Sequence, residues 1–121
     1  MKNILLAEDD KFISDIYTTK FKEEGFEVEV ACDGQDCLSK LEEKKPDLLI
    51  LDIVLPKIDG WEILRKIKAN DNLKDLKVVI LSNIAQKENI ERGIKSGIIK
   101  YFIKAHYTPT EICEEIKKIL E

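Results

Sequence analysis

Charged and hydroxyl-bearing side chains follow directly after short apolar runs at four places in this 121-residue sequence. They are Glu8, Asp9 and Asp10 after the first run, Asp52 after the third, Ser82 after the fourth and Lys104 after the fifth. Carboxylates that lie close together repel one another, and surroundings of low dielectric constant magnify the repulsion. Such a cluster needs a cation. Carboxylate oxygens suit Mg²⁺, and neither Cys nor His stands near these acids to favour a softer metal.

A lysine and a hydroxyl beside such a cation indicate a site for a phosphoryl group. Lys104 offers a point charge to phosphate oxygens, and Ser82 offers a hydrogen-bond donor. Enzymes transfer phosphoryl groups mainly by positioning and charge neutralisation, and a carboxylate can itself be the nucleophile, which gives an acyl phosphate. Taken singly, each residue has a plain structural explanation, such as a helix cap or a solvated lysine. Their joint placement on one rim favours the phosphoryl site.

The elements that must place these residues on one rim are a parallel sheet and its connecting helices. Five runs rich in Ile, Leu and Val, at 4–7, 28–31, 48–51, 78–81 and 98–103, alternate with longer stretches of helical period. Strands that are covered by helices on both faces have such continuous apolar sequences. We therefore predict an α/β fold, (βα)5, with a doubly wound five-stranded parallel sheet and helices on both faces. Ligands bind beyond the carboxyl ends of such strands.

Apolar spacing and capping residues in the sequence predict helices at the places that this order of elements requires. The spacing of Phe12, Ile13, Ile16 and Phe21 predicts the apolar stripe of the first helix. The segments 33–34, 59–62 and 108–111 have the residue types of helix starts, the last with a full capping box and a proline at the first helical position. The fourth helical stretch, 86–95, is weak because it has few apolar residues.

Composition limits the class of protein. Apolar residues make up 44% and charged residues 36%, with a net charge of −4. This predicts one globular domain over residues 1–121, without a membrane span or signal peptide, and without the basic footprint of direct nucleic-acid binding. Cys32, Cys37 and Cys113 have neither metal-site spacing nor an even number. We expect these cysteines to be small, buried apolar side chains of a protein in a reducing cytoplasm.

Over essentially its whole length the sequence resembles the receiver domain of two-component response regulators. The matching segments are ILLAEDD at 4–10, PDLLILD at 46–52, LPKIDG at 55–60, VVILS at 78–82 and YFIK at 101–104. Each segment alone is a weak signal, and all five in order are highly specific. The resemblance implies the strand order 2-1-3-4-5 and a phosphorylation-dependent signalling switch in a phosphorelay.

The resemblance also implies roles for the acidic residues. Asp52 would accept a phosphoryl group from a phosphohistidine on a histidine kinase or a histidine phosphotransfer protein. Asp9 and Asp52 would bind Mg²⁺, with Glu8 acting through water and the backbone carbonyl of Val54 completing the protein ligands. Asp10 would cap the first helix.

The remaining family positions concern the response to phosphorylation. Ser82 and Lys104 would bind phosphoryl oxygens, and Tyr101 would turn inward as Ser82 moves. The signal would appear on the surface of the fourth helix, fifth strand and fifth helix, where a downstream protein target binds. Two residues depart from the family pattern. Ala105 stands where the family has a proline after a cis peptide bond, so we expect a trans bond here. Asn83 replaces a small residue.

Several alternatives stay open at this point. A degenerate receiver would act as a phosphorylation-independent binding module, which the two departures favour. A Mg²⁺-dependent phosphohydrolase is disfavoured, because Val54 stands where its second acid is needed; we expect self-catalysed phosphorylation and dephosphorylation rather than a conventional enzyme. The apolar Val54 and Ile84 beside the site predict a long-lived phosphoryl group. The chain could be a stand-alone receiver or part of a longer regulator.

Overall fold

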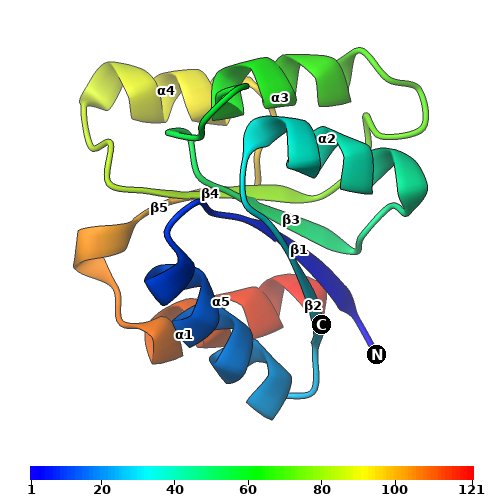
Figure 1. Cartoon of the computed structure of the whole chain (residues 1–121). Coiled ribbons are helices and arrows are strands. Elements are labelled where there is room, and N and C mark those ends of the chain that lie inside the picture. Colours follow the sequence, from blue (N-terminus) through cyan, green and yellow to red (C-terminus); the bar gives the residue numbers. More distant parts are fainter.

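A parallel five-stranded sheet forms the middle layer of the protein, with helices on both of its faces (Figure 1). The computed structural model describes residues 1–121. The strands are β1 (Asn3–Ala7), β2 (Glu27–Ala31), β3 (Leu48–Leu51), β4 (Val78–Ser82) and β5 (Lys100–Ile103). The helices are α1 (Lys11–Glu23), α2 (Gly34–Glu43), α3 (Gly60–Lys68), α4 (Lys87–Lys95) and α5 (Pro109–Leu120). The strand order β2-β1-β3-β4-β5 confirms the predicted topology.

Each face of the sheet has its own apolar core. Side chains alternate between the two faces of a strand, so Leu5 and Leu49 pack toward α2 and α3, whereas Ile4 and Ile50 pack toward α1 and α5. In Figure 1, α2, α3 and α4 lie above the sheet and α1 and α5 below it. All residues of β3 and β4 are buried, which explains why their apolar runs do not alternate.

The edge strands differ from the central ones. Residues of β2 alternate between more and less exposed, because β2 pairs with β1 alone. The predicted start of the fifth strand at residue 98 is two residues early. Ile98 is buried, but the ladder begins where Lys100 pairs with Val79. The carboxyl ends of all five strands still meet at one edge, which is the property the site depends on.

The apolar stripe predicted for the first helix is partly wrong. Phe12 is 76% exposed and Ile16 is 39% exposed. The buried face of α1 instead has Ser14, Tyr17 and Phe21, which recur at intervals of three and four residues. Phe12 lies in the first helical turn, just past the carboxyl end of β1, and its side chain faces solvent. Tyr17, absent from the predicted stripe, is part of the core.

The predicted helix starts are confirmed. The side chains of Asp33 and Asp59 accept hydrogen bonds from the backbone N–H three residues later, and Thr108 forms the full capping box with Glu111. The loop before α2 packs tightly against the loop after β3. A Cβ atom added to Gly34 would lie only 1.8 Å from the carbonyl oxygen of Ile58, so only glycine fits there.

The cysteine prediction is correct for two residues. Cys37 and Cys113 are buried, whereas Cys32 is exposed, because it follows the edge strand β2. All three thiols are free.

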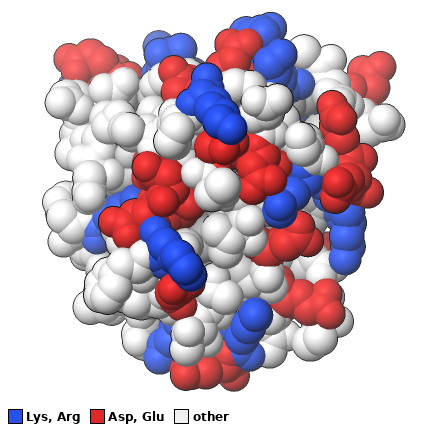
Figure 2. Space-filling view, viewed as in Figure 1, with Lys and Arg blue, Asp and Glu red and all other residues white.

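Charges of both signs are interspersed over the surface drawn in Figure 2, and no large patch of one sign covers it. Several pairs are local to one helix, such as Lys11 with Asp15 and Lys40 with Asp36. None of the helices combines the length and the apolarity that crossing a membrane requires.

Candidate functional site

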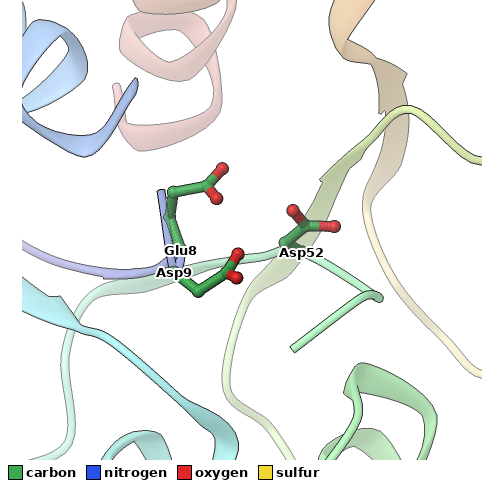
Figure 3. A group of neighbouring side chains, drawn as sticks. All are labelled: Glu8, Asp9 and Asp52. Atoms are coloured by element: carbon green, nitrogen blue, oxygen red, sulfur yellow. The ribbon is translucent and has the colours of Figure 1, made fainter. Parts of the chain in front are cut away.

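Three carboxylates meet at the carboxyl edge of the sheet. Glu8 and Asp9 directly follow β1, and Asp52 directly follows β3. These strands are neighbours, with Ala7 paired to Leu51, and the backbone N–H of Asp52 donates to the carbonyl of Ala7 at 3.1 Å. One oxygen from each of the three carboxylates lies within 4.8 Å of the others. Figure 3 shows the three side chains around one space.

The charge balance of this cluster is set by burial and by Lys104. The Nζ of Lys104 donates to Oδ2 of Asp52 at 2.7 Å and also forms a short hydrogen bond to Oε1 of Glu8. Burial raises the pKa of Glu8, and the hydrogen bonds from Lys104 and from the backbone of Asp10 only partly oppose it. Burial alone would lower the pKa of Lys104, but its hydrogen bonds to Asp52 and Glu8 outweigh that effect and raise it. Lys104 is therefore a cation held between two acids.

The lysine is placed by a short 3-10 turn, Lys104–His106, that follows β5. The chain contains no cis peptide bond, so the Lys104–Ala105 bond is trans, as predicted. Lys104 still reaches Asp52 and Glu8, which shows that the proline of the family pattern is not needed to bring the ammonium group to the acids.

Asp10 lies outside the cluster. Its side chain accepts a hydrogen bond from the backbone N–H of Ile13 at 3.2 Å and thereby caps α1, as predicted. The backbone N–H of Val54 donates to Oδ1 of Asp52 at 3.2 Å, while the Val54 side chain is 60% exposed. Val54 thus lies beside the acids, and its role as a metal ligand stays a prediction.

Ser82 and Tyr101 lie next to this group on β4 and β5. Ser82 is fully buried, and its Oγ accepts a hydrogen bond from the N–H of Ile84 at 3.3 Å. The hydroxyl of Tyr101 donates to the carbonyl of Ile84 at 2.7 Å. Burial raises the pKa of Tyr101. Both side chains therefore hold the same loop, which leads from β4 into α4.

One neighbour of the site was absent from the sequence prediction. Tyr17 is 5% exposed on α1, and the charges of Lys104 and Glu8 both act on its hydroxyl, although burial is the main reason why the pKa of Tyr17 is raised. Its position seven residues after Asp10, four after Ile13 and four before Phe21 is the signal that could have placed it on the inner face of α1.

A hollow of about 310 Å³ adjoins Lys104. It is lined by Ile13, Ile16, Tyr17, Asn83, Lys104, Ala105 and Pro109. Lys104 lines this hollow and also binds Asp52 and Glu8 of the acidic cluster. A larger hollow of about 490 Å³ lies around β2 and includes none of the predicted site residues.

The donor set fits a hard divalent cation. Three carboxylates provide oxygen ligands only, and no thiol or imidazole belongs to the cluster. Mg²⁺ and Mn²⁺ both favour such ligands, with water and phosphate oxygens completing the shell. The cluster is thus compatible with metal binding.

Comparison with known proteins gives the class to which this fold and site belong. The family model described as "Response regulator receiver domain" matches residues 4–117. The chain belongs to the response regulator receiver domain family.

Two curated relatives of this chain are named as transcriptional regulators. The alkaline phosphatase synthesis transcriptional regulatory protein PhoP of Bacillus subtilis is 32% identical over 121 residues, which cover 98% of this chain and 48% of that protein. The DNA-binding dual master transcriptional regulator RpaA of Synechocystis is 31% identical over 104 residues, covering 86% of this chain and 43% of that protein. The chain spans about half the length of such relatives. The expected absence of direct nucleic-acid binding is not supported by these names and stays a prediction.

Solved structures agree on the fold. The receiver domain of the Francisella response regulator 1452 superposes with a TM-score of 0.87 at 32% identity, covering 98% of this chain and 95% of that one. The Mn²⁺-bound form of response regulator Rcp1 has a TM-score of 0.85 at 27% identity, covering 98% and 91%. The BeF3-activated DrrB receiver domain has a TM-score of 0.86 at 28% identity, covering 99% and 97%.

Proposed function

We propose that this receiver domain is a phosphorylation-controlled switch in which Asp52 accepts a phosphoryl group from a phosphohistidine of a histidine kinase or phosphotransfer protein. The observation that carries the proposal is the meeting of the carboxylates of Glu8, Asp9 and Asp52 with the ammonium group of Lys104 at one point. Acids crowded in this way without a second cation would repel one another, whereas a phosphoryl group and its metal would satisfy them.

Each residue of the site would have its own role in the phosphoryl transfer. A carboxylate oxygen of Asp52 attacks phosphorus, the P–N bond to the donor imidazole breaks, and the imidazole leaves, so that an acyl phosphate forms on Asp52. Glu8, Asp9, Asp52 and the carbonyl of Val54 would hold Mg²⁺. When bound, Mg²⁺ neutralises charge on the phosphoryl oxygens. The backbone N–H of Val54 already donates to Asp52 and helps to orient its carboxylate.

Lys104 and Ser82 would bind the new phosphoryl oxygens. Lys104 changes partner from the Asp52 carboxylate to a phosphoryl oxygen with little movement, because it already lies 2.7 Å from Oδ2. Ser82 would rotate from the N–H of Ile84 toward the phosphoryl group, and Tyr101 would follow because it binds the same loop. This links the chemistry at Asp52 to α4, β5 and α5.

The output of the switch would be contact with a downstream protein in the cytoplasm. The net charge of −4, together with the interspersed charges on the face drawn in Figure 2, favours a protein partner over direct nucleic-acid binding by these 121 residues. The domain would catalyse its own phosphorylation and dephosphorylation and turn over no separate substrate. The alternative of a phosphorylation-independent binding module predicts no uptake of a phosphoryl group at all.

Incubation with acetyl phosphate and Mg²⁺, followed by intact-mass measurement, tests the proposal. We expect one phosphoryl group on the wild-type chain and on Asp59→Asn, which retains a helix-capping side chain, and none on Asp52→Asn. Chelation of the metal should abolish the labelling. An unlabelled wild-type chain would support the binding module instead.

A further inference from the structure

The fourth helix is held to the rest of the protein by few contacts. Gly93 is its only fully buried residue, whereas α3 buries four residues and α5 another four. The residue before α4, Gln86, makes no side-chain capping bond. A Cβ atom on Gly93 would lie 3.1 Å from side-chain atoms of Ile80 and Tyr101, so α4 approaches the sheet closely at this one point. Helices with little buried surface are the ones most easily displaced.

Next to Gly93, Arg92 connects α4 to α3. Its guanidinium carbon lies 4.3 Å from the centre of the Trp61 ring, within the range of a cation–π contact. Arg92 forms no ion pair, so the aromatic ring is its principal partner, unlike the other arginine, Arg65, which pairs with Glu62. Trp61 in turn is half-buried and packs on the core between the sheet and α3.

The two sides of this contact are attached to different parts of the phosphorylation site. Trp61 follows Gly60, whose N–H donates to the carbonyl of Ile53 and whose Cα lies so close to the backbone that an added Cβ would be 2.8 Å from the carbonyl oxygen of Asp52. The start of α3 is therefore fixed to the end of β3. The start of α4 instead follows the loop that Ser82 and Tyr101 hold through Ile84.

We infer that the stack of Arg92 on Trp61 is a latch that holds α4 against α3, and that phosphorylation of Asp52 opens it. The inference rests on the proposed function. A phosphoryl group that draws Ser82 toward Asp52 moves the loop before α4, while the start of α3 stays with β3. The contact between the two helices is then the one that separates. A cation–π contact at a partly exposed position shifts such an equilibrium by about two- to fivefold.

The single tryptophan of the chain makes the latch directly observable. We would measure quenching of Trp61 fluorescence by acrylamide, a neutral quencher, in wild type, Arg92→Met and Lys95→Met. Lys95 is a matched control because it is an exposed base on the same helix without an ion pair. Each chain is measured with Mg²⁺ alone and with Mg²⁺ and beryllofluoride as the phosphoryl mimic, and ¹⁹F NMR reports whether beryllofluoride has bound.

Beryllofluoride should increase the quenching constant of wild type and of Lys95→Met. Arg92→Met should start above the wild-type value and increase less with beryllofluoride, and acetyl phosphate should label it about two to five times faster than wild type. Equal quenching constants of Arg92→Met and wild type with Mg²⁺ alone would overturn the latch. An unchanged quenching constant of wild type with beryllofluoride bound would also overturn it. Failure of wild type to bind beryllofluoride contradicts the proposed function itself, and the opening of the latch with it.

Discussion

The ammonium nitrogen of Lys104 lies 2.7 Å from Oδ2 of Asp52, although 52 residues separate them along the chain. The same nitrogen binds Glu8, 96 residues away. The side chains of Lys104, Glu8 and Asp52 are 12%, 3% and 9% exposed. One largely enclosed cation therefore compensates two buried acids, and the stability of the domain should depend on it.

Lys104→Met should lower the free energy of unfolding by about 3 kcal/mol, because it leaves two buried carboxylates without a cation. Mg²⁺ should recover much of this loss, since a ligand that binds only the folded state stabilises it. Urea denaturation with and without Mg²⁺ measures both effects. Lys100→Met is the matched control on β5, where a more exposed ion pair to Glu115 should contribute at most about 1 kcal/mol. A smaller response to Mg²⁺ in Lys104→Met than in Lys100→Met would contradict this account of the cluster.

The three thiols should react very differently. Burial raises the pKa of Cys37 to about 12 and also raises that of Cys113, while Cys32 is exposed. Since the thiolate is the reactive form, a raised pKa leaves less of it at any pH below that value. Iodoacetamide at pH 8 should therefore add once to the folded protein, at Cys32, and three times in urea. At pH 10 Cys37 should still react slowly, because a thiol with a pKa of about 12 is mostly protonated at that pH. Rapid alkylation of Cys37 in the folded protein would show that α2 does not bury it as described.

Gly34→Ala should be one of the most destabilising changes of a single methyl group in the chain. The new Cβ would lie 1.8 Å from the Ile58 carbonyl oxygen, and we expect a loss of about 3 kcal/mol as the two loops separate. Gly25→Ala meets no atom within 4 Å but keeps a φ of +91°, so it should lose only about 1 kcal/mol. Urea midpoints with unchanged slopes would measure both losses. Equal losses would mean that the loops are not in contact.

The phosphoryl group on Asp52 should be long-lived. The two side chains beside the site, Val54 and Ile84, are apolar and cannot orient a water molecule for attack. Val54 is 60% exposed, so Val54→Asn should fold normally. The asparagine should speed loss of the phosphoryl group by roughly tenfold, below the contribution of a full proton-transfer group. The decay of the phosphorylated mass with Mg²⁺ after removal of the donor gives both rates. Fast decay in the wild type would refute the hypothesis, whatever the variant does.

Strand ends were the part of the site that could be predicted from sequence. Asp52 and Lys104 each follow a run of residues typical of a buried strand, and parallel strands place such positions on one edge. The spacing could not show that Lys104 would bind both Asp52 and Glu8, because a lysine side chain has four flexible carbons and several acids within reach.

The exposure of individual side chains was the feature that the sequence predicted least well. Phe12 and Ile16 have the residue types of a buried stripe, but they lie on the side of α1 that no other layer covers. Tyr17 is buried in their place because helix rotation is set by packing against β1 and α5, which residue type alone does not reveal. The Arg92–Trp61 contact joins two helices whose distance depends on the whole fold, so no local signal indicates it.

The most direct test of the central claim is to locate the phosphoryl group. Borohydride reduces an aspartyl phosphate to homoserine, so a chain treated first with acetyl phosphate and Mg²⁺ and then with borohydride carries a permanent mark at the phosphorylated residue. Peptide mass spectrometry should find homoserine at position 52 and nowhere else, and only when Mg²⁺ was present. Homoserine at position 9, 10 or 59 in place of 52, or none in a chain that has gained a phosphoryl group, would contradict the assignment of Asp52 as the acceptor.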